Sequence, residues 1–199
     1  MKKLIISEAL PSGTLVSVDI QPEYKTSIDR SFNLYDYAKL LNKHKGNIVI
    51  LYNGESLGFP PESELIEWLY DIGVKEQTID RAIFYDKGYA FFRYCMDSGI
   101  DEDDIVQLVR FMRDNNINDS RDIDEETWDN FVEHFTSNEI RDLLEYAGDC
   151  ISIPDLMDFI QNYSNITLIG GGINECLKEV EIALKALNKP YKTIDEFTY

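Results

Sequence analysis

The chain has 199 residues, 44% of them hydrophobic and 12% aromatic, which is enough for one domain with a sizeable core and excludes wholesale disorder. Its 37 acidic and 19 basic residues give a formal net charge of -18. This charge argues against partners such as nucleic acid or an anionic membrane surface, because both attract clusters of Lys and Arg.

The cysteines and the apolar segments bear on where the protein works. Cys95, Cys150 and Cys176 are an odd number without CxxC spacing, which suits a reducing compartment better than a disulfide framework. No stretch approaches the ~20 apolar residues of a membrane span, and the apolar start of the chain is too short for a secretory signal. We therefore expect a cytoplasmic protein with no membrane association.

The first half of the chain alternates predicted strands with predicted helices. The run "NIVILYN" is apolar throughout, which is typical of a strand buried on both faces of a parallel sheet. The segment beginning "PPESEL" combines prolines with apolar residues every three or four positions, which predicts a helix. In chain order the expected elements are a strand at 14–20, a helix at 33–44, a strand at 47–53, a helix at 60–74 and a strand at 79–89.

The end of the chain continues the same alternation. We expect a helix at 151–165, a strand and glycine-rich turn at 166–172, a strongly amphipathic helix at 174–189 and a last strand at 190–197. Strands that alternate with helices of about a dozen residues indicate βαβ units. The predicted fold class is α/β: a doubly wound, mostly parallel sheet with helices on both faces, in a single domain spanning 1–199.

Residues 100–150 interrupt this alternation. Between positions 101 and 150 there are 16 acidic and 4 basic residues, a net charge of 4 − 16 = −12. Three amphipathic patterns, at 101–115, 124–135 and 137–148, predict an acidic, all-helical insertion. A solvated set of helices is the simplest interpretation, and a substrate lid or a docking surface for a protein partner are the alternatives.

Three reactive side chains follow predicted strands. Asp19 ends the first strand, Lys87 follows the third, and Cys176 begins the helix after the fourth. Ligands of open parallel sheets bind beyond the carboxyl ends of the strands, so these residues are expected at one rim. Each also has an ordinary interpretation: a capping carboxylate, a solvated turn lysine and a small buried cysteine.

Together the three would be chemically coherent. A thiol in the first turn of a helix is held towards the thiolate by the helix dipole and by a nearby ammonium. A carboxylate within reach could accept the thiol proton and return it to a leaving amine. The preceding glycines would let backbone N–H groups approach a developing oxyanion.

The segments "VSVDIQPEY", "DKGYAFF" and "GGGINECLKEVEIAL" resemble, in this order, three motifs of the isochorismatase-like cysteine hydrolases. The resemblance covers roughly residues 14–97 and 151–199. It implies a small-molecule substrate, Asp19 as general acid and base, Lys87 as the orienting cation and Cys176 as the nucleophile that forms a thioester. It also implies an oxyanion hole from the backbone N–H groups of Gly172 and Cys176.

The resemblance carries further expectations about the backbone, the cofactors and the assembly. A cis peptide bond that family members carry before the cysteine would fall at Gly171–Gly172. Gln21 would support the backbone near the site. Metal-using members have a histidine cluster after the second strand, where this chain has no histidine; His44 and His134 are expected at the surface. We therefore expect no metal and no cofactor, and whether copies associate into a homo-oligomer is left open.

Two functional hypotheses follow. The first is a hydrolase that cleaves a C–N bond of a small amide or carbamoyl compound. Cys176 favours amide chemistry over the vinyl-ether chemistry of isochorismatase itself, which lacks the cysteine. The second is a weakly active or non-catalytic protein that binds a protein partner through the acidic insertion.

Overall fold

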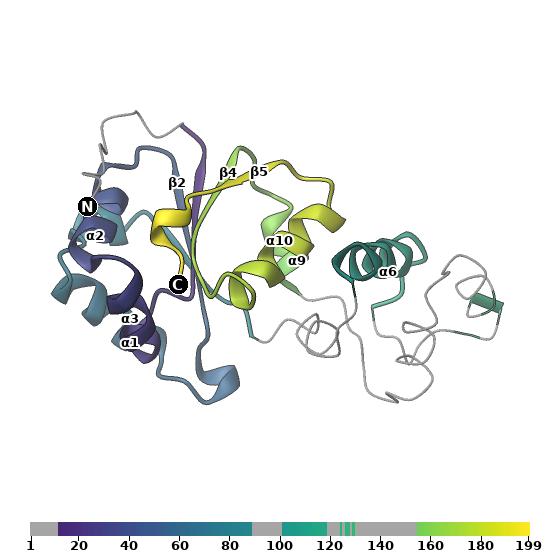
Figure 1. The fold of residues 1–199 in the computed structure, drawn as a ribbon, viewed down its shortest axis with the longest axis horizontal. Coiled ribbons are helices and arrows are strands. Elements are labelled where there is room, and N and C mark those ends of the chain that lie inside the picture. Colours follow the sequence, from purple (N-terminus) through teal and green to yellow (C-terminus); the bar gives the residue numbers. More distant parts are fainter. Residues whose placement is uncertain (1–11, 89–100, 119–123, 125, 128, 130–154) are drawn as a thin grey trace. The chain divides into compact units, whose positions relative to one another are not determined.

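A computed structural model of the protein describes residues 12–88, 101–118, 124, 126, 127, 129 and 155–199. Within them lies a five-stranded, all-parallel sheet with the strand order β3-β2-β1-β4-β5, shown in Figure 1. This confirms the predicted α/β class and the parallel sheet. The strands are β1 (Thr14–Val18), β2 (Asn47–Tyr52), β3 (Ala82–Asp86), β4 (Ile166–Gly170) and β5 (Tyr191–Thr193).

The described helices fall largely where periodicity predicts them. The expected ones are α2 (Leu34–Lys43), α3 (Glu62–Asp71), α6 (Glu102–Asp114), α9 (Asp155–Ile160) and α10 (Cys176–Ala186). The structure adds α1 (Lys25–Ser31), α4 (Glu76–Ile79) and the short 3-10 turns η1 (Pro22–Tyr24), η2 (Glu55–Leu57) and η4 (Asp195–Phe197). The last strand is therefore shorter than predicted, because its end curls into η4. Among the described residues, no helix has the length and apolarity needed to cross a bilayer.

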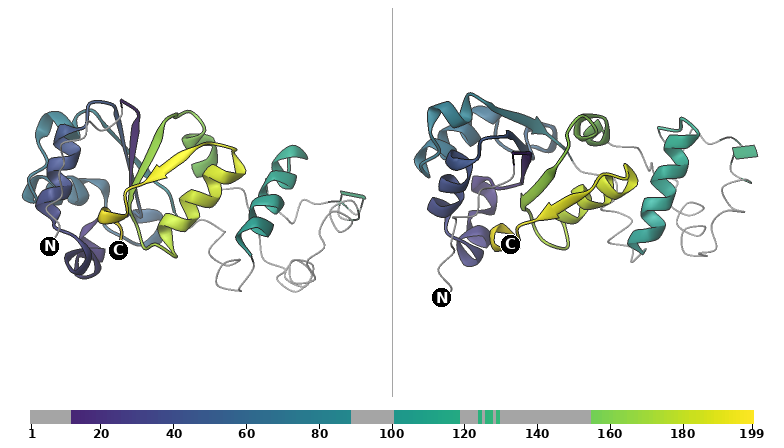
Figure 2. Two further views of the ribbon diagram at one scale, coloured as in Figure 1. Left: turned by 45° about the horizontal axis from the view of Figure 1, so that its top comes forward. Right: turned by 90° about the horizontal axis from the view of Figure 1, so that it is seen from above.

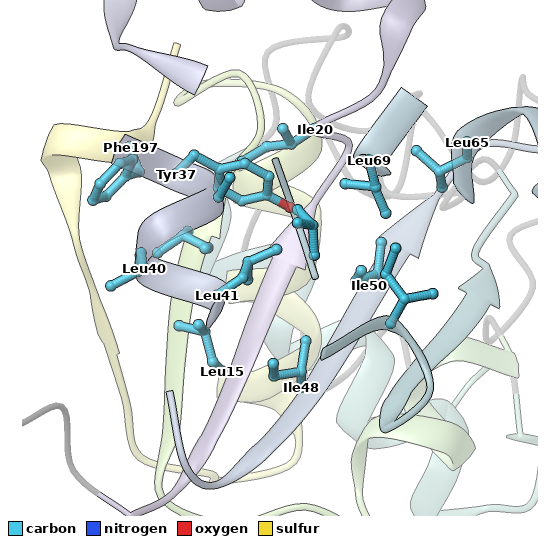
Figure 3. Packing of buried hydrophobic residues seen from close by; sticks show 14 of the residues in the cluster. Leu15, Ile20, Tyr37, Leu40, Leu41, Ile48, Ile50, Leu65, Leu69 and Phe197 are labelled. Carbon is cyan, nitrogen blue, oxygen red and sulfur yellow. The ribbon is translucent and has the colours of Figure 1, made fainter. Parts of the chain in front are cut away.

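One face of the sheet is covered by α1, α2 and α3, as both views in Figure 2 show. Leu15, Ile48 and Ile50 project from the strands towards Leu41 and Leu69 of the helices, as Figure 3 shows. Within this layer the buried Ser17 and Tyr37 hydroxyls are 2.9 Å apart, so each satisfies the hydrogen bonding of the other. The opposite strand face, with Val16, Val49 and Leu51, is also buried, which explains the unbroken apolar runs.

The described residues divide into two compact units. The first contains 12–88, 163–178 and 190–199, and the second contains the described parts of 89–162 together with 179–189. In the second unit α6 is attached to the end of α10. Arg110 of α6 donates to the carbonyl oxygens of Lys185 (2.5 Å) and Ala186 (3.3 Å), and Glu102 pairs with Lys185. Such contacts satisfy the last carbonyl groups of a helix with a cation.

Helix α6 confirms the first of the three helices predicted in the acidic insertion. The helices predicted at 124–135 and 137–148 lie almost entirely outside the described residues, as do Cys95, Cys150 and His134. The predicted helix at 151–165 is described only from Asp155, where α9 begins.

His44 is not at the surface, which corrects the expectation from the sequence. The residue is 4% exposed, and Nε2 lies 3.1 Å from the carbonyl oxygens of both Gly13 and Asn47. Burial lowers the pKa of His44 more than these two carbonyl groups raise it, and the Arg81 cation adds to the lowering. The ring is buried because it lies between the carbonyl group of Gly13, just before β1, and that of Asn47, the first residue of β2.

We expect this histidine to make folding pH-dependent. Because the folded pKa lies below the unfolded value of about 6.5, protonation favours the unfolded chain. Stability due to His44 should be complete above about pH 6.5 and should fall as the pH drops through the folded pKa, by at most about 1.4 kcal/mol per pH unit.

Urea titrations of the wild type and of His44→Gln between about pH 5 and 7.5 measure this effect. The difference between their free energies of unfolding should shift in favour of the variant as the pH falls. A difference that stays constant across this range would contradict the assignment, whatever the absolute stabilities.

Candidate active site

The candidate site lies at the carboxyl ends of the strands. Residues that directly follow β3, β2 and β1 are Lys87, Asn53 and Asp19, and β4 ends in the glycines that lead to Cys176. The backbone hydrogen bonding of the sheet continues to this rim. Asp19 N–H donates to the carbonyl of Leu51 and Lys87 N–H donates to the carbonyl of Tyr52, each at 2.9 Å. Strands β2 and β4 flank β1 on opposite sides, so Asp19 stands where the strand order changes direction. Ligands of open α/β sheets bind at such a switch point.

Asp19 and Lys87 form a buried ion pair. The ammonium of Lys87 lies 3.1 Å from Oδ2 of Asp19, and the two side chains are 2% and 0% exposed. Asp19 also has a φ of 48°, in the left-handed region that residues other than glycine rarely adopt. A buried charge and a strained backbone each carry a cost, of several kcal/mol and about 1–3 kcal/mol respectively.

Burial and nearby donors oppose each other in setting the protonation of Asp19. Burial raises the pKa of Asp19, and this outweighs the lowering by the Lys87 charge, the Cys176 thiol and the Asn53 amide. Among the described residues, no donor is in good hydrogen-bond alignment with either carboxylate oxygen, so the attraction to Lys87 is chiefly electrostatic. A raised pKa suits a group that takes and returns a proton near neutral pH.

Cys176 is the first residue of α10 and is half-buried. Its thiol lies near enough to the carboxyl group of Asp19 to lower the pKa of that group, although the two residues are far apart in the sequence. Cys176 therefore lies in the first turn of a helix, where the helix dipole favours a negative charge such as a thiolate. The structure thus brings Asp19, Lys87 and Cys176 together around Asp19.

The glycine turn before Cys176 is built by positive φ angles. Gly170 and Gly171 have φ of 84° and 70°, and the Gly171–Gly172 bond is trans, which corrects the expected cis bond. The turn achieves its direction through these two left-handed residues instead. An added Cβ at Gly170 would lie 2.3 Å from the Val18 carbonyl oxygen, and one at Gly171 would lie 2.8 Å from the Leu177 nitrogen. Only glycine fits both positions.

Gln21 supports the backbone, as expected. Its side chain accepts from the N–H of Asn53 at 2.9 Å and donates to the carbonyl of Asn53 at 3.2 Å. Asn53 in turn donates to the hydroxyl of Tyr24 at 3.1 Å, and its own Oδ1 is buried without a hydrogen-bond partner. Neither Asn53 nor Tyr24 was identified from the sequence. Asn53 lies at the carboxyl end of a predicted strand, where ligands of parallel sheets bind, so the same reasoning that selected Asp19 also applies to it.

Asp86 is a second residue that sequence reasoning missed, and it fixes the backbone beside Lys87. Its carboxylate accepts from Gly54 N–H at 3.0 Å, from the Ser56 hydroxyl at 2.9 Å and from Gly88 N–H at 3.2 Å. Burial alone would raise the pKa of Asp86, but these donors outweigh it and leave the pKa lowered. Asp86 therefore ties the loop after β3 to the loop after β2.

Among the described residues, neither a cavity with reactive side chains nor a metal site provides a second candidate site. A cavity of about 220 Å³ is lined by Asn165, Tyr191 and neighbouring residues at the amino ends of β4 and β5, the opposite end of the sheet from Asp19. It contains no reactive cluster, and we assign it no part in the chemistry. Over the described parts of the chain, no group of three or more His, Cys, Asp or Glu side chains could hold a metal ion.

Comparisons with known proteins do not assign the chain to a family. No protein-family model, no curated protein and no solved structure matches it.

Replacing Lys87 by Met should destabilise the protein strongly. The change removes the cation that balances a buried carboxylate, which costs about 3–5 kcal/mol in other buried pairs. The folded pKa of Asp19 lies above the unfolded value of about 3.9, so the stability that Asp19 contributes falls as the pH rises through that window. The loss in Lys87→Met should therefore be smaller near pH 4 than at pH 7.

Lys25→Met is the matched control, because Lys25 pairs with Asp29 at 2.5 Å on the surface. Exposed pairs contribute about 1 kcal/mol or less, so this variant should unfold at nearly the wild-type urea concentration. Adding Asp19→Asn to Lys87→Met should recover much of the lost stability. Equal losses from Lys25→Met and Lys87→Met would contradict a buried pair.

Proposed function

We propose that the protein is a cysteine hydrolase that cleaves a C–N bond of a small amide or carbamoyl compound. The observation that carries the proposal is the meeting of Lys87 and Cys176 at one buried carboxylate, Asp19, at the switch point of a parallel sheet. The three motifs that resemble the isochorismatase-like cysteine hydrolases agree with it. A partly exposed thiol at a helix start beside an ammonium has the surroundings that lower a thiol pKa in reactive cysteines.

The proposed reaction uses a covalent intermediate. Asp19 accepts the proton of the Cys176 thiol, and Sγ attacks the carbonyl carbon of the substrate to form a C–S bond. The tetrahedral intermediate then collapses, the C–N bond breaks, and Asp19 returns the proton to the departing amine. Water, deprotonated by Asp19, attacks the resulting thioester and releases the acid and the free thiol.

The remaining groups have supporting roles. Lys87 holds Asp19 in place and offers a positive charge when the thiolate forms. Backbone N–H groups of Gly172 and Cys176 serve as donors to the oxyanion in this proposal, because Cys176 begins a helix and the glycine turn carries no side chains. The residues named complete the cycle by proton transfer and thioester chemistry, so this scheme requires no cofactor.

Alkylation of Cys176 tests whether the thiol is activated. At about pH 6.5, iodoacetamide should label Cys176 in the folded protein at least about tenfold faster than in urea, because activation raises the thiolate fraction. Mass spectrometry of the Cys176 peptide separates this label from the other cysteines. Asp19→Ala and Lys87→Ala should remove the acceleration, and Lys25→Ala should keep it.

Turnover tests the chemistry itself. Small amides and carbamoyl compounds are assayed for amine or ammonia release, and acid quenching during turnover should trap an acyl group on Cys176. Cys176→Ala should abolish both. A thiol that is no more reactive in the folded chain than in urea would refute the hydrolase and favour the alternative, a protein that works by binding a partner.

A further inference from the structure

We propose that Tyr199 is a positioning residue that holds Asp19 and the turn before Cys176 in register. The inference deepens the proposed function and rests on it. Tyr199 belongs to none of the three motifs, and no pattern in the sequence selects it. In the structure, however, it contacts the backbone on both sides of the switch point, within the same compact unit as the site.

The side chain of Tyr199 acts on the strained residue. Its hydroxyl donates to the backbone carbonyl of Asp19 at 2.8 Å. Asp19 is the residue whose φ is 48°, so this hydrogen bond fixes a peptide group that would otherwise favour another conformation. The orientation of that peptide also sets the direction in which the Asp19 side chain leaves the backbone.

The main chain of Tyr199 acts on the glycine turn. Its N–H donates to the carbonyl of Gly171 at 3.1 Å, and its carbonyl accepts from the N–H of Ile173 at 3.0 Å. Tyr199 thus forms two backbone hydrogen bonds with the glycine turn, in the pattern by which a residue pairs with a parallel strand. One residue thus joins the general base in the proposed reaction to the segment that carries the nucleophile.

The phenol is suited to a fixed role as a donor. Burial raises the pKa of Tyr199, and the neighbouring Asp19 and Cys176 charges raise it further, so the hydroxyl keeps its proton at any working pH. The ring packs beside that of Tyr24, with centroids 6.1 Å apart, which restricts its rotation. The hydroxyl therefore stays aimed at Asp19 throughout a reaction cycle.

Tyr199→Phe removes the hydroxyl and leaves both main-chain bonds intact. We expect the midpoint of the pH profile of Cys176 alkylation to move by at least about 0.5 pH unit, and the rate at about pH 6.5 to fall at least about threefold. Tyr35→Phe is the matched control, because Tyr35 is 68% exposed and has no part in the proposed site. Its profile should overlay that of the wild type.

A double-mutant cycle shows whether Tyr199 acts through Asp19. In the Asp19→Asn background, Tyr199→Phe should cause no further shift of the alkylation profile. If Tyr199→Phe lowers the folded fraction, the profiles are measured in sucrose, which favours the folded state. Circular dichroism confirms folding in each case.

The outcomes separate the two proposals. A wild-type Cys176 without accelerated alkylation refutes the hydrolase. An accelerated Cys176 whose profile is unchanged in Tyr199→Phe refutes the positioning role alone, even if the melting temperature falls. A shift that persists undiminished in the Asp19→Asn background also refutes it, because Tyr199 would then act independently of Asp19.

Discussion

The buried ion pair between Asp19 and Lys87 is the constraint on which the rest of the site depends. A carboxylate and an ammonium removed from water contribute little net stability, since desolvation offsets their attraction. At the end of β1, Asp19 also adopts a left-handed backbone conformation. The desolvation of the ion pair and the left-handed backbone therefore both destabilise the fold at Asp19. This residue lies where ligands of open α/β sheets bind.

The surroundings of this pair are organised to keep it in place. Gln21 and Asn53 link the ends of β1 and β2, and Asp86 links the loops after β2 and β3. On the other side of β1, the Gly170–Gly171 turn brings the backbone close to Val18 and to the start of α10. These contacts hold the site from both strands next to β1. A polar site is pre-organised only when its dipoles are fixed, because mobile dipoles would reorient as charge moves.

The sequence predicted the parts of the structure that depend on local pattern. Unbroken apolar runs identified the strands, and the strand-end rule selected Asp19, Lys87 and Cys176 because parallel strands bring their carboxyl ends to one edge. It missed what depends on long-range packing. The ring of His44 is buried against the carbonyl group of Gly13, 31 residues away in the sequence, and α1 is too short for a clear period. The glycines of the turn were noticed, but the sequence alone could not distinguish a cis bond from two left-handed residues.

The order of the strands has a consequence for how the chain acquires its shape during synthesis. Strand β1 is followed closely in the sequence by one neighbour, β2, yet its other neighbour, β4, comes some 150 residues later, with Thr14 opposite Ile166. At about 5–20 residues per second, that edge of β1 stays unpaired on the ribosome for many seconds. An apolar strand with an open edge is a template for pairing with other chains, so this edge is exposed to such pairing until β4 has been made. The thiol and the carboxylate meet only when that edge closes, so a prematurely terminated chain cannot assemble the site.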